Sequence, residues 1–244
     1  MITVERFISI LFLVASLLVD FVLYDMAGSQ SGTALPAMLL WGFLFAQCGL
    51  VASFLAQGTA FPLLRFMCLV FMVLFSALLL ASLTELSGEI WVGILTVHVA
   101  VIVVTLIAIR VYYHVKRQFS LSEIFAATTL VALLCGMFPH VAFPWNQAVA
   151  IVPAVLGFTL PVLFYVWLVQ TERYQWKYQA MLIFWAVALG QVAGLFDGTP
   201  GAGFLLSAFN ASCAFYLLAA MMVKKHSQTI RIPILKFQAR SVSF

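Results

Sequence analysis

Charged side chains are scarce in this 244-residue chain, since Asp, Glu, Lys and Arg together make up only 8% of it. An ordinary soluble domain carries about a quarter of such residues. Hydrophobic residues take their place at 65%, and the mean hydropathy is +1.13. The shortage of charge excludes an ordinary soluble domain and predicts an integral membrane protein.

The sequence also lacks the polar–apolar alternation of outer-membrane strands. Its apolar runs are instead about 18 to 23 residues long, and a hydrocarbon core of roughly 30 Å needs a helix of about 20 residues. The sequence therefore predicts an all-α transmembrane bundle that forms a single domain, followed by a basic tail at 224–244. Eight spans are expected, at 7–24, 34–55, 61–83, 90–111, 119–138, 148–169, 178–196 and 203–223.

Recognised catalytic and cofactor patterns are missing. There is no H-E-x-x-H, no G-x-S-x-G, no glycine-rich phosphate loop and no lysine within a span that could hold retinal. We interpret the cysteines as packing residues because they lie in predicted spans without C-x-x-C spacing: Cys48, Cys68, Cys135 and Cys213. We thus predict no catalytic residue, metal site or cofactor, while a single-histidine or quinone site stays open.

The segment 119–138 decides the topology. It begins with Ser120-x-x-Glu123, a capping box, and ends at Gly136 and Pro139, which stop helices. If it crosses, all 12 Lys and Arg fall on one side of the membrane; if it does not, they split five and seven. Because Lys and Arg in short loops stay cytoplasmic, we predict that it crosses and that both termini are cytoplasmic.

The same segment carries a family resemblance. Residues 119–137 read FSLSEIFAATTLVALLCGM, and the pattern F-S-L-x-x-[IL]-x-x-x-T-T-L-V-A resembles a helix signature in uncharacterised bacterial polytopic membrane proteins. The resemblance covers under a tenth of the chain and has Glu123 where a basic or small polar residue is expected. It implies a bacterial inner-membrane location and no particular activity.

Few polar side chains lie inside the predicted spans, and each is costly there. We predict that four of them form a polar site in the outer half of the membrane, about 7 to 12 Å deep or slightly deeper: Asp20, His98, Gln191 and Asn210. Ser16, Asp20 and Tyr24 share one face of the first span. Alternatively, Asp20 reaches the headgroups and His98 is a neutral histidine that is hydrogen-bonded to a neighbouring helix. For Gln47, Gln191 and Asn210, interhelical hydrogen bonding is the simpler interpretation.

Small residues recur at four-residue steps in the last two spans. Gly190 and Gly194 lie on one such stripe and Gly203 and Ser207 on the other, which predicts a tightly packed helical hairpin. Beyond it the tail has five basic residues and no acid. We expect these residues to contact anionic lipid or a protein partner: Lys224, Lys225, Arg231, Lys236 and Arg240.

Two classes of function remain after these exclusions. The first is a small-solute or proton-coupled permease that uses the outer-half polar groups and a span kinked near Pro161. The second is a non-catalytic sensor or assembly subunit that holds a partner, or a second copy of itself, through small-residue helix faces and the basic tail. A water-accessible cavity that reaches Asp20 and His98 would favour the first, and a dry bundle with an exposed small-residue face would favour the second.

Overall fold

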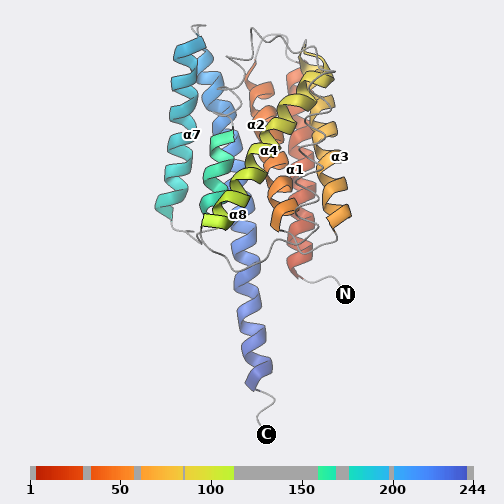
Figure 1. The fold of residues 1–244 in the computed structure, drawn as a ribbon, viewed down its shortest axis with the longest axis vertical. Coiled ribbons are helices and arrows are strands. Elements are labelled where there is room, and N and C mark those ends of the chain that lie inside the picture. Colours follow the sequence, from red (N-terminus) through yellow and green to blue (C-terminus); the bar gives the residue numbers. More distant parts are fainter. Residues whose placement is uncertain are drawn as a thin grey trace.

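A computed structural model gives the fold of residues 4–29, 34–57, 62–84, 86–112, 159–168, 176–197 and 201–240. These residues form an all-α bundle (Figure 1) of seven helices. Six are long: α1 (Val4–Ser29), α2 (Leu35–Gln57), α3 (Pro62–Leu83), α4 (Gly88–Tyr112), α7 (Trp176–Asp197) and α8 (Ala202–Arg240). The seventh is a ten-residue helix, Thr159–Leu168.

Membrane-spanning length and composition are present in five helices of the described part. These candidate spans are Ile8–Ser29, Leu35–Leu55, Leu63–Leu83, Gly88–Ala108 and Ala202–Val223. They confirm the predicted class, a multi-pass helical membrane protein. The first helix continues to Ser29, five residues beyond its predicted end, because residues 25–29 contain no proline and the isolated Gly28 is tolerated within a helix. The predicted span at 119–138, and most of the one at 148–169, lie outside the described residues.

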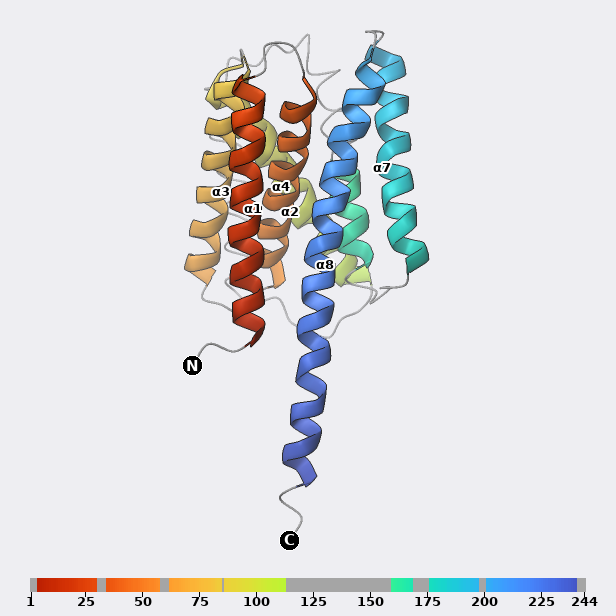
Figure 2. The ribbon, with the colours of Figure 1, turned by 180° about the vertical axis from the view of Figure 1, so that it is seen from behind.

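The long helices run alternately up and down the bundle. Figures 1 and 2 place both termini at the same end, and α4 ends and α7 begins at that end as well. The backbone of α8 continues beyond the bundle there and carries the tail to Arg240 as one 39-residue helix. The five basic tail residues lie on this extension.

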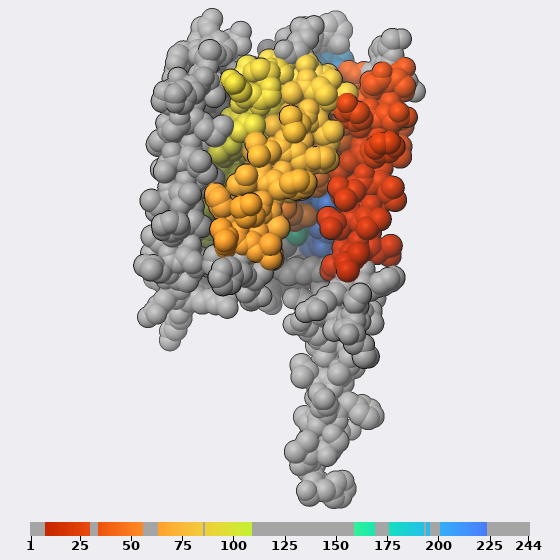
Figure 3. Space-filling model, turned by 90° about the vertical axis from the view of Figure 1, so that its right-hand side faces the viewer, coloured from red at the N-terminus to blue at the C-terminus, as the bar shows by residue number. Residues whose placement is uncertain are grey.

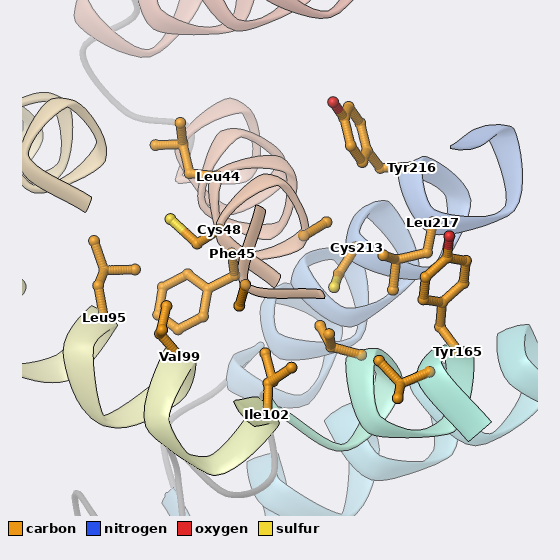
Figure 4. Packing of buried hydrophobic residues seen from close by; sticks show 14 of the residues in the cluster. Leu44, Phe45, Cys48, Leu95, Val99, Ile102, Tyr165, Cys213, Tyr216 and Leu217 are labelled. Carbon is orange, nitrogen blue, oxygen red and sulfur yellow. The ribbon is translucent and has the colours of Figure 1, made fainter. Parts of the chain in front are cut away.

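The core forms where α2 and α8 pack together between the other helices. More than half of each span is buried, 56% in both, whereas α1 lies at the periphery with 11% buried. Figure 4 shows Phe45 of α2 directed toward Val99 of α4, with Cys213 and Leu217 of α8 beside it. These interdigitating apolar side chains hold the polar groups of α2 in fixed positions.

The backbones of α7 and α8 approach each other closely, at the small residues for which the sequence predicts a tight hairpin. A Cβ atom on Gly190 would lie 2.3 Å from the Ser207 nitrogen, and one on Gly194 would lie 2.1 Å from the Gly203 Cα. Glycine is therefore required at both positions. Since these small residues face one another within the chain, this stripe is not free to hold a partner.

Candidate functional site

The polar face of α1 arises from helical spacing. Ser16 and Asp20 are one turn apart and both are buried, at 7% and 3% exposure, whereas Leu13, Leu17 and Phe21 point outward. A helix whose outer surface is apolar and whose inner surface holds a carboxyl group suits a lipid environment only if that carboxyl meets polar partners.

Those partners come from α2 and α8. The Gln47 Nε2 donates to Asp20 Oδ2 at 2.5 Å and to Ser16 Oγ at 2.9 Å. The Ser16 Oγ in turn forms a hydrogen bond with the Tyr216 hydroxyl at 2.8 Å. Asp20, Gln47, Ser16 and Tyr216 thus form one chain of hydrogen bonds across three helices, which we call the carboxyl cluster.

Two acceptor atoms of the carboxyl cluster have no hydrogen-bond partner among the described residues. They are Asp20 Oδ1 and Gln47 Oε1, which belong to side chains only 3% and 5% exposed. A buried acceptor without a donor costs about 1–3 kcal/mol. A proton on Asp20 would turn one of these acceptors into a donor and so reduce that cost. The carboxyl cluster therefore has the chemistry of a proton-binding site.

His98 is not part of the carboxyl cluster and has other partners. Its side chain is fully buried; its Nδ1 lies 2.8 Å from Thr159 Oγ1 and its Nε2 lies 3.1 Å from the Phe45 carbonyl oxygen. A carbonyl can only accept, so the proton of a neutral ring is on Nε2 and the Thr159 hydroxyl donates to Nδ1. The Phe45 ring packs edge-on against the imidazole at 4.9 Å. His98 joins α4 to α2 and to the helix Thr159–Leu168.

The other two predicted site residues lie elsewhere again. The Gln191 Nε2 donates to Ser207 Oγ at 2.9 Å and to the Gly203 carbonyl at 3.2 Å, so Gln191 belongs to the α7–α8 hairpin. Asn210 is 2% exposed, and its Oδ1 has no hydrogen-bond partner among the described residues. The hydrogen bonds of the described residues do not join Asp20, His98, Gln191 and Asn210 into one site.

Depth also differs from the sequence expectation. Nine residues of α1 follow Asp20, and ten of α4 separate His98 from Gly88, which corresponds to about 14 and 15 Å along the helix axes. Both residues are near the middle of their candidate spans because α1 and α4 extend beyond the predicted boundaries. The alternative in which the first helix ends early, so that Asp20 reaches the headgroups, does not fit this helix.

Tyr216 and Thr159 are the functional-site residues that sequence reasoning did not select. Tyrosine in membrane proteins gathers at the interfaces, yet Tyr216 lies seven residues inside the end of its candidate span at Val223. That displacement from the interface is the signal that identifies it. For Thr159 no comparable signal exists, because a threonine hydroxyl in a helix can donate to a backbone carbonyl of the same helix and so needs no partner from another one.

No protein-family model, curated protein or solved structure matches this chain. Among the described residues there is no group of three or more His, Cys, Asp and Glu side chains that could hold a metal ion. The functional argument therefore depends on the carboxyl cluster.

Proposed function

We propose that this protein is a proton-coupled carrier of small solutes in the bacterial inner membrane, with Asp20 as the group that binds the coupling proton. It crosses the membrane eight times with both termini in the cytoplasm. The observation that supports the proposal is a mid-span carboxyl group with one oxygen that has no hydrogen-bond partner among the described residues. At 3% exposure this group is closed to water in the structure, so transport requires a second conformation that opens a path to it.

The positions of the helix ends support eight crossings. Because α4 ends and α7 begins at the same end of the bundle, the segment between them crosses an even number of times (Figure 1). The helix Thr159–Leu168 belongs to this segment and is buried against the others, with Thr159, Val162 and Leu168 at 0% exposure. A buried helix in this segment favours two crossings over none, which makes eight in total.

The charges support a cytoplasmic location for the termini. Arg6 near the start of α1, Arg65 in the first turn of α3 and Lys177 at the start of α7 all lie at the end of the bundle that holds both termini. Glu89, in the first turn of α4, lies at the opposite end. Excess Lys and Arg mark the cytoplasmic side.

The carboxyl cluster can couple proton binding to helix movement. When Asp20 is ionised, it accepts from the Gln47 amide; when it is protonated, it becomes a donor and can bond the open Gln47 Oε1 after the amide turns over. The amide would then no longer donate to Ser16, whose hydroxyl would have to donate to Gln47 Oε1 and accept from Tyr216 instead. Because α1 is peripheral and contributes few buried residues, a change in these bonds acts on the helix that is held least firmly.

The test compares two aspartates of the same helix. Purified protein is reconstituted into liposomes that contain a pH-sensitive dye, and proton entry is followed while a panel of amino acids, sugars and ions is added outside. We expect solute-dependent proton entry for the natural protein and at least a tenfold lower rate for Asp20→Asn. Asp25→Asn is the matched control, because Asp25 lies on α1 but is exposed, and it should retain the rate.

Two results would contradict the proposal. If no member of the panel drives proton entry in the natural protein, proton-coupled transport is wrong for these solutes. If Asp20→Asn transports protons as well as Asp25→Asn does, the carboxyl cluster serves only to pack α1.

A further inference from the structure

A second buried charge lies at the end of the bundle that holds both termini. Arg65 is in the first turn of α3 on the stripe that packs inward, together with Leu69, Val73, Ala77 and Leu80, and only 6% of it is exposed. Its Nη1 donates to the Leu55 carbonyl in the last turn of α2 at 2.6 Å. Its Nε is buried and has no hydrogen-bond partner among the described residues.

Capping of α2 accounts for only part of this arrangement. A cation near the C-terminal carbonyls of a helix is favourable, and a single N–H satisfies that need. The guanidinium group, however, presents five N–H donors and a full charge, and burying such a charge is costly unless an anion accompanies it. Among the described residues, Arg65 has a carbonyl partner at Nη1 and no hydrogen-bond partner at Nε, so its charge has room for an anionic partner.

The surface beside Arg65 is open toward the membrane. Figure 3 shows a hollow between α1 and the first turns of α3, through which atoms of α2 and α8 are visible. Arg65 belongs to the first turn of α3, beside this hollow, and it contacts the last turn of α2. Nearby positions on α3 carry apolar side chains that point outward, including Leu64 and Met67, both 58% exposed. A charged group beside the hollow and exposed apolar side chains on the same turns of α3 match an amphiphile rather than a soluble ion.

We propose that the hollow between α1 and α3 binds an anionic phospholipid, with its phosphate on Arg65 and an acyl chain along the apolar walls. A guanidinium group binds a phosphate through two parallel hydrogen bonds. Because the Nε atom is buried in this structure, the Arg65 side chain would turn toward the hollow to present this unused donor to a phosphate oxygen. Anionic lipids are abundant in the cytoplasmic leaflet, which is the side assigned to this end under the proposed function. A lipid seated there would hold α1, the peripheral helix, against the bundle.

The experiment measures thermal unfolding of the full-length protein in uncharged detergent micelles as phosphatidylglycerol is added. Saturable stabilisation is expected, with no comparable effect from phosphatidylcholine or from inorganic phosphate. Replacing Arg65 by Gln keeps an amide donor for the Leu55 carbonyl and removes the charge. It should weaken the apparent affinity for phosphatidylglycerol roughly 10- to 100-fold, as loss of a charge-assisted hydrogen bond does.

Lys177→Gln is the matched control, because it removes one positive charge from the same end of the bundle at an exposed side chain. It should leave the phosphatidylglycerol effect unchanged. If Arg65→Gln does not fold, Arg65→Lys replaces it; that variant keeps the charge without the two-pronged donor and should bind several-fold more weakly.

Three outcomes would overturn the lipid site. Stabilisation by inorganic phosphate alone would show a free-anion site. Equal loss in Lys177→Gln would show only diffuse attraction to the basic end. Loss of stability without lipid in Glu5→Gln or Glu172→Gln, matching that of Arg65→Gln, would show that the chain supplies its own counter-charge. None of these results depends on proton transport, so the lipid site can fail while the function of Asp20 stands.

Discussion

At the scale of single residues, α2 separates the two ionisable groups that the sequence singled out. The backbone of Phe45 contacts His98, whereas the side chain of Gln47 contacts Asp20. Two residues along an α-helix are about 200° apart around its axis, so these contacts lie on nearly opposite faces of α2. Asp20 and His98 have similar depths but different partners.

This separation makes a prediction about free energies of unfolding. Asp20→Asn and His98→Gln should each change the free energy of unfolding in detergent, and in the double variant the two changes should add within about 0.5 kcal/mol. Asp20→Asn with Gln47→Leu is the positive control, because those side chains share a hydrogen bond and their effects should not add. A large coupling between Asp20 and His98 would show that α2 transmits changes from one face to the other.

Sequence periodicity identified which residues of α1 would be polar and share a face, because that depends on helical spacing alone. Ser16 and Asp20 followed from it, and both lie in the carboxyl cluster. The partner of each group could not be derived, since it depends on which helices become neighbours. Gln47 was read as a hydrogen-bonding residue without a named partner, and Tyr216 was not selected because its hydroxyl belongs to a side chain counted as apolar.

At the scale of elements, the packing of α7 against α8 is the contact between helices that the sequence pattern predicts most directly. Four-residue steps keep Gly190 and Gly194 on one face of α7, and Gly203 and Ser207 on the facing side of α8. In lipid, where water does not drive helices together, close backbone contact supplies much of the attraction. This pattern can be recognised without knowing how the other helices are arranged. The central position of α2, by contrast, depends on every neighbour and has no comparable sequence signal.

Adding one methyl group should distinguish packed from open glycines. Gly194→Ala places a Cβ atom against the backbone of Gly203, so we expect a loss of about 1–3 kcal/mol in the free energy of unfolding. Gly93→Ala is the control, because Gly93 is also inside a helix but has no atom within 4 Å of the added Cβ. It should be neutral or stabilise by up to about 1 kcal/mol. Equal effects of the two substitutions on thermal unfolding would contradict the close contact.

At the scale of the whole molecule, the distribution of charge determines which side each end faces. Helix length and hydropathy identified the class of protein, because the hydrocarbon core sets both. The number of spans depends on residues 113–158. For this segment the prediction of a crossing at 119–138 is based on the distribution of the 12 basic residues. If 148–169 crossed and 119–138 did not, the basic residues would be divided between the two sides, and α7 would begin at the end opposite to the one where α4 ends. The preference for Lys and Arg on the cytoplasmic side and the positions of these two helices both oppose that arrangement.

Cysteine labelling tests this arrangement directly. In a background where Cys48, Cys68, Cys135 and Cys213 are replaced by Ala, single cysteines are introduced at selected positions and treated with a membrane-impermeant maleimide. Positions 87 and 146 should react in intact cells, whereas 118 and 241 should react only after the membrane is opened. Positions 118 and 146 flank the segment 119–138, so opposite sidedness of this pair is what a crossing requires. Reaction of both from the same side would remove that span. With α4 and α7 placed as in Figure 1, the span at 148–169 would then be lost as well and six spans would remain; if 148–169 still crossed, the basic residues would divide five and seven, against the charge asymmetry that orients such proteins.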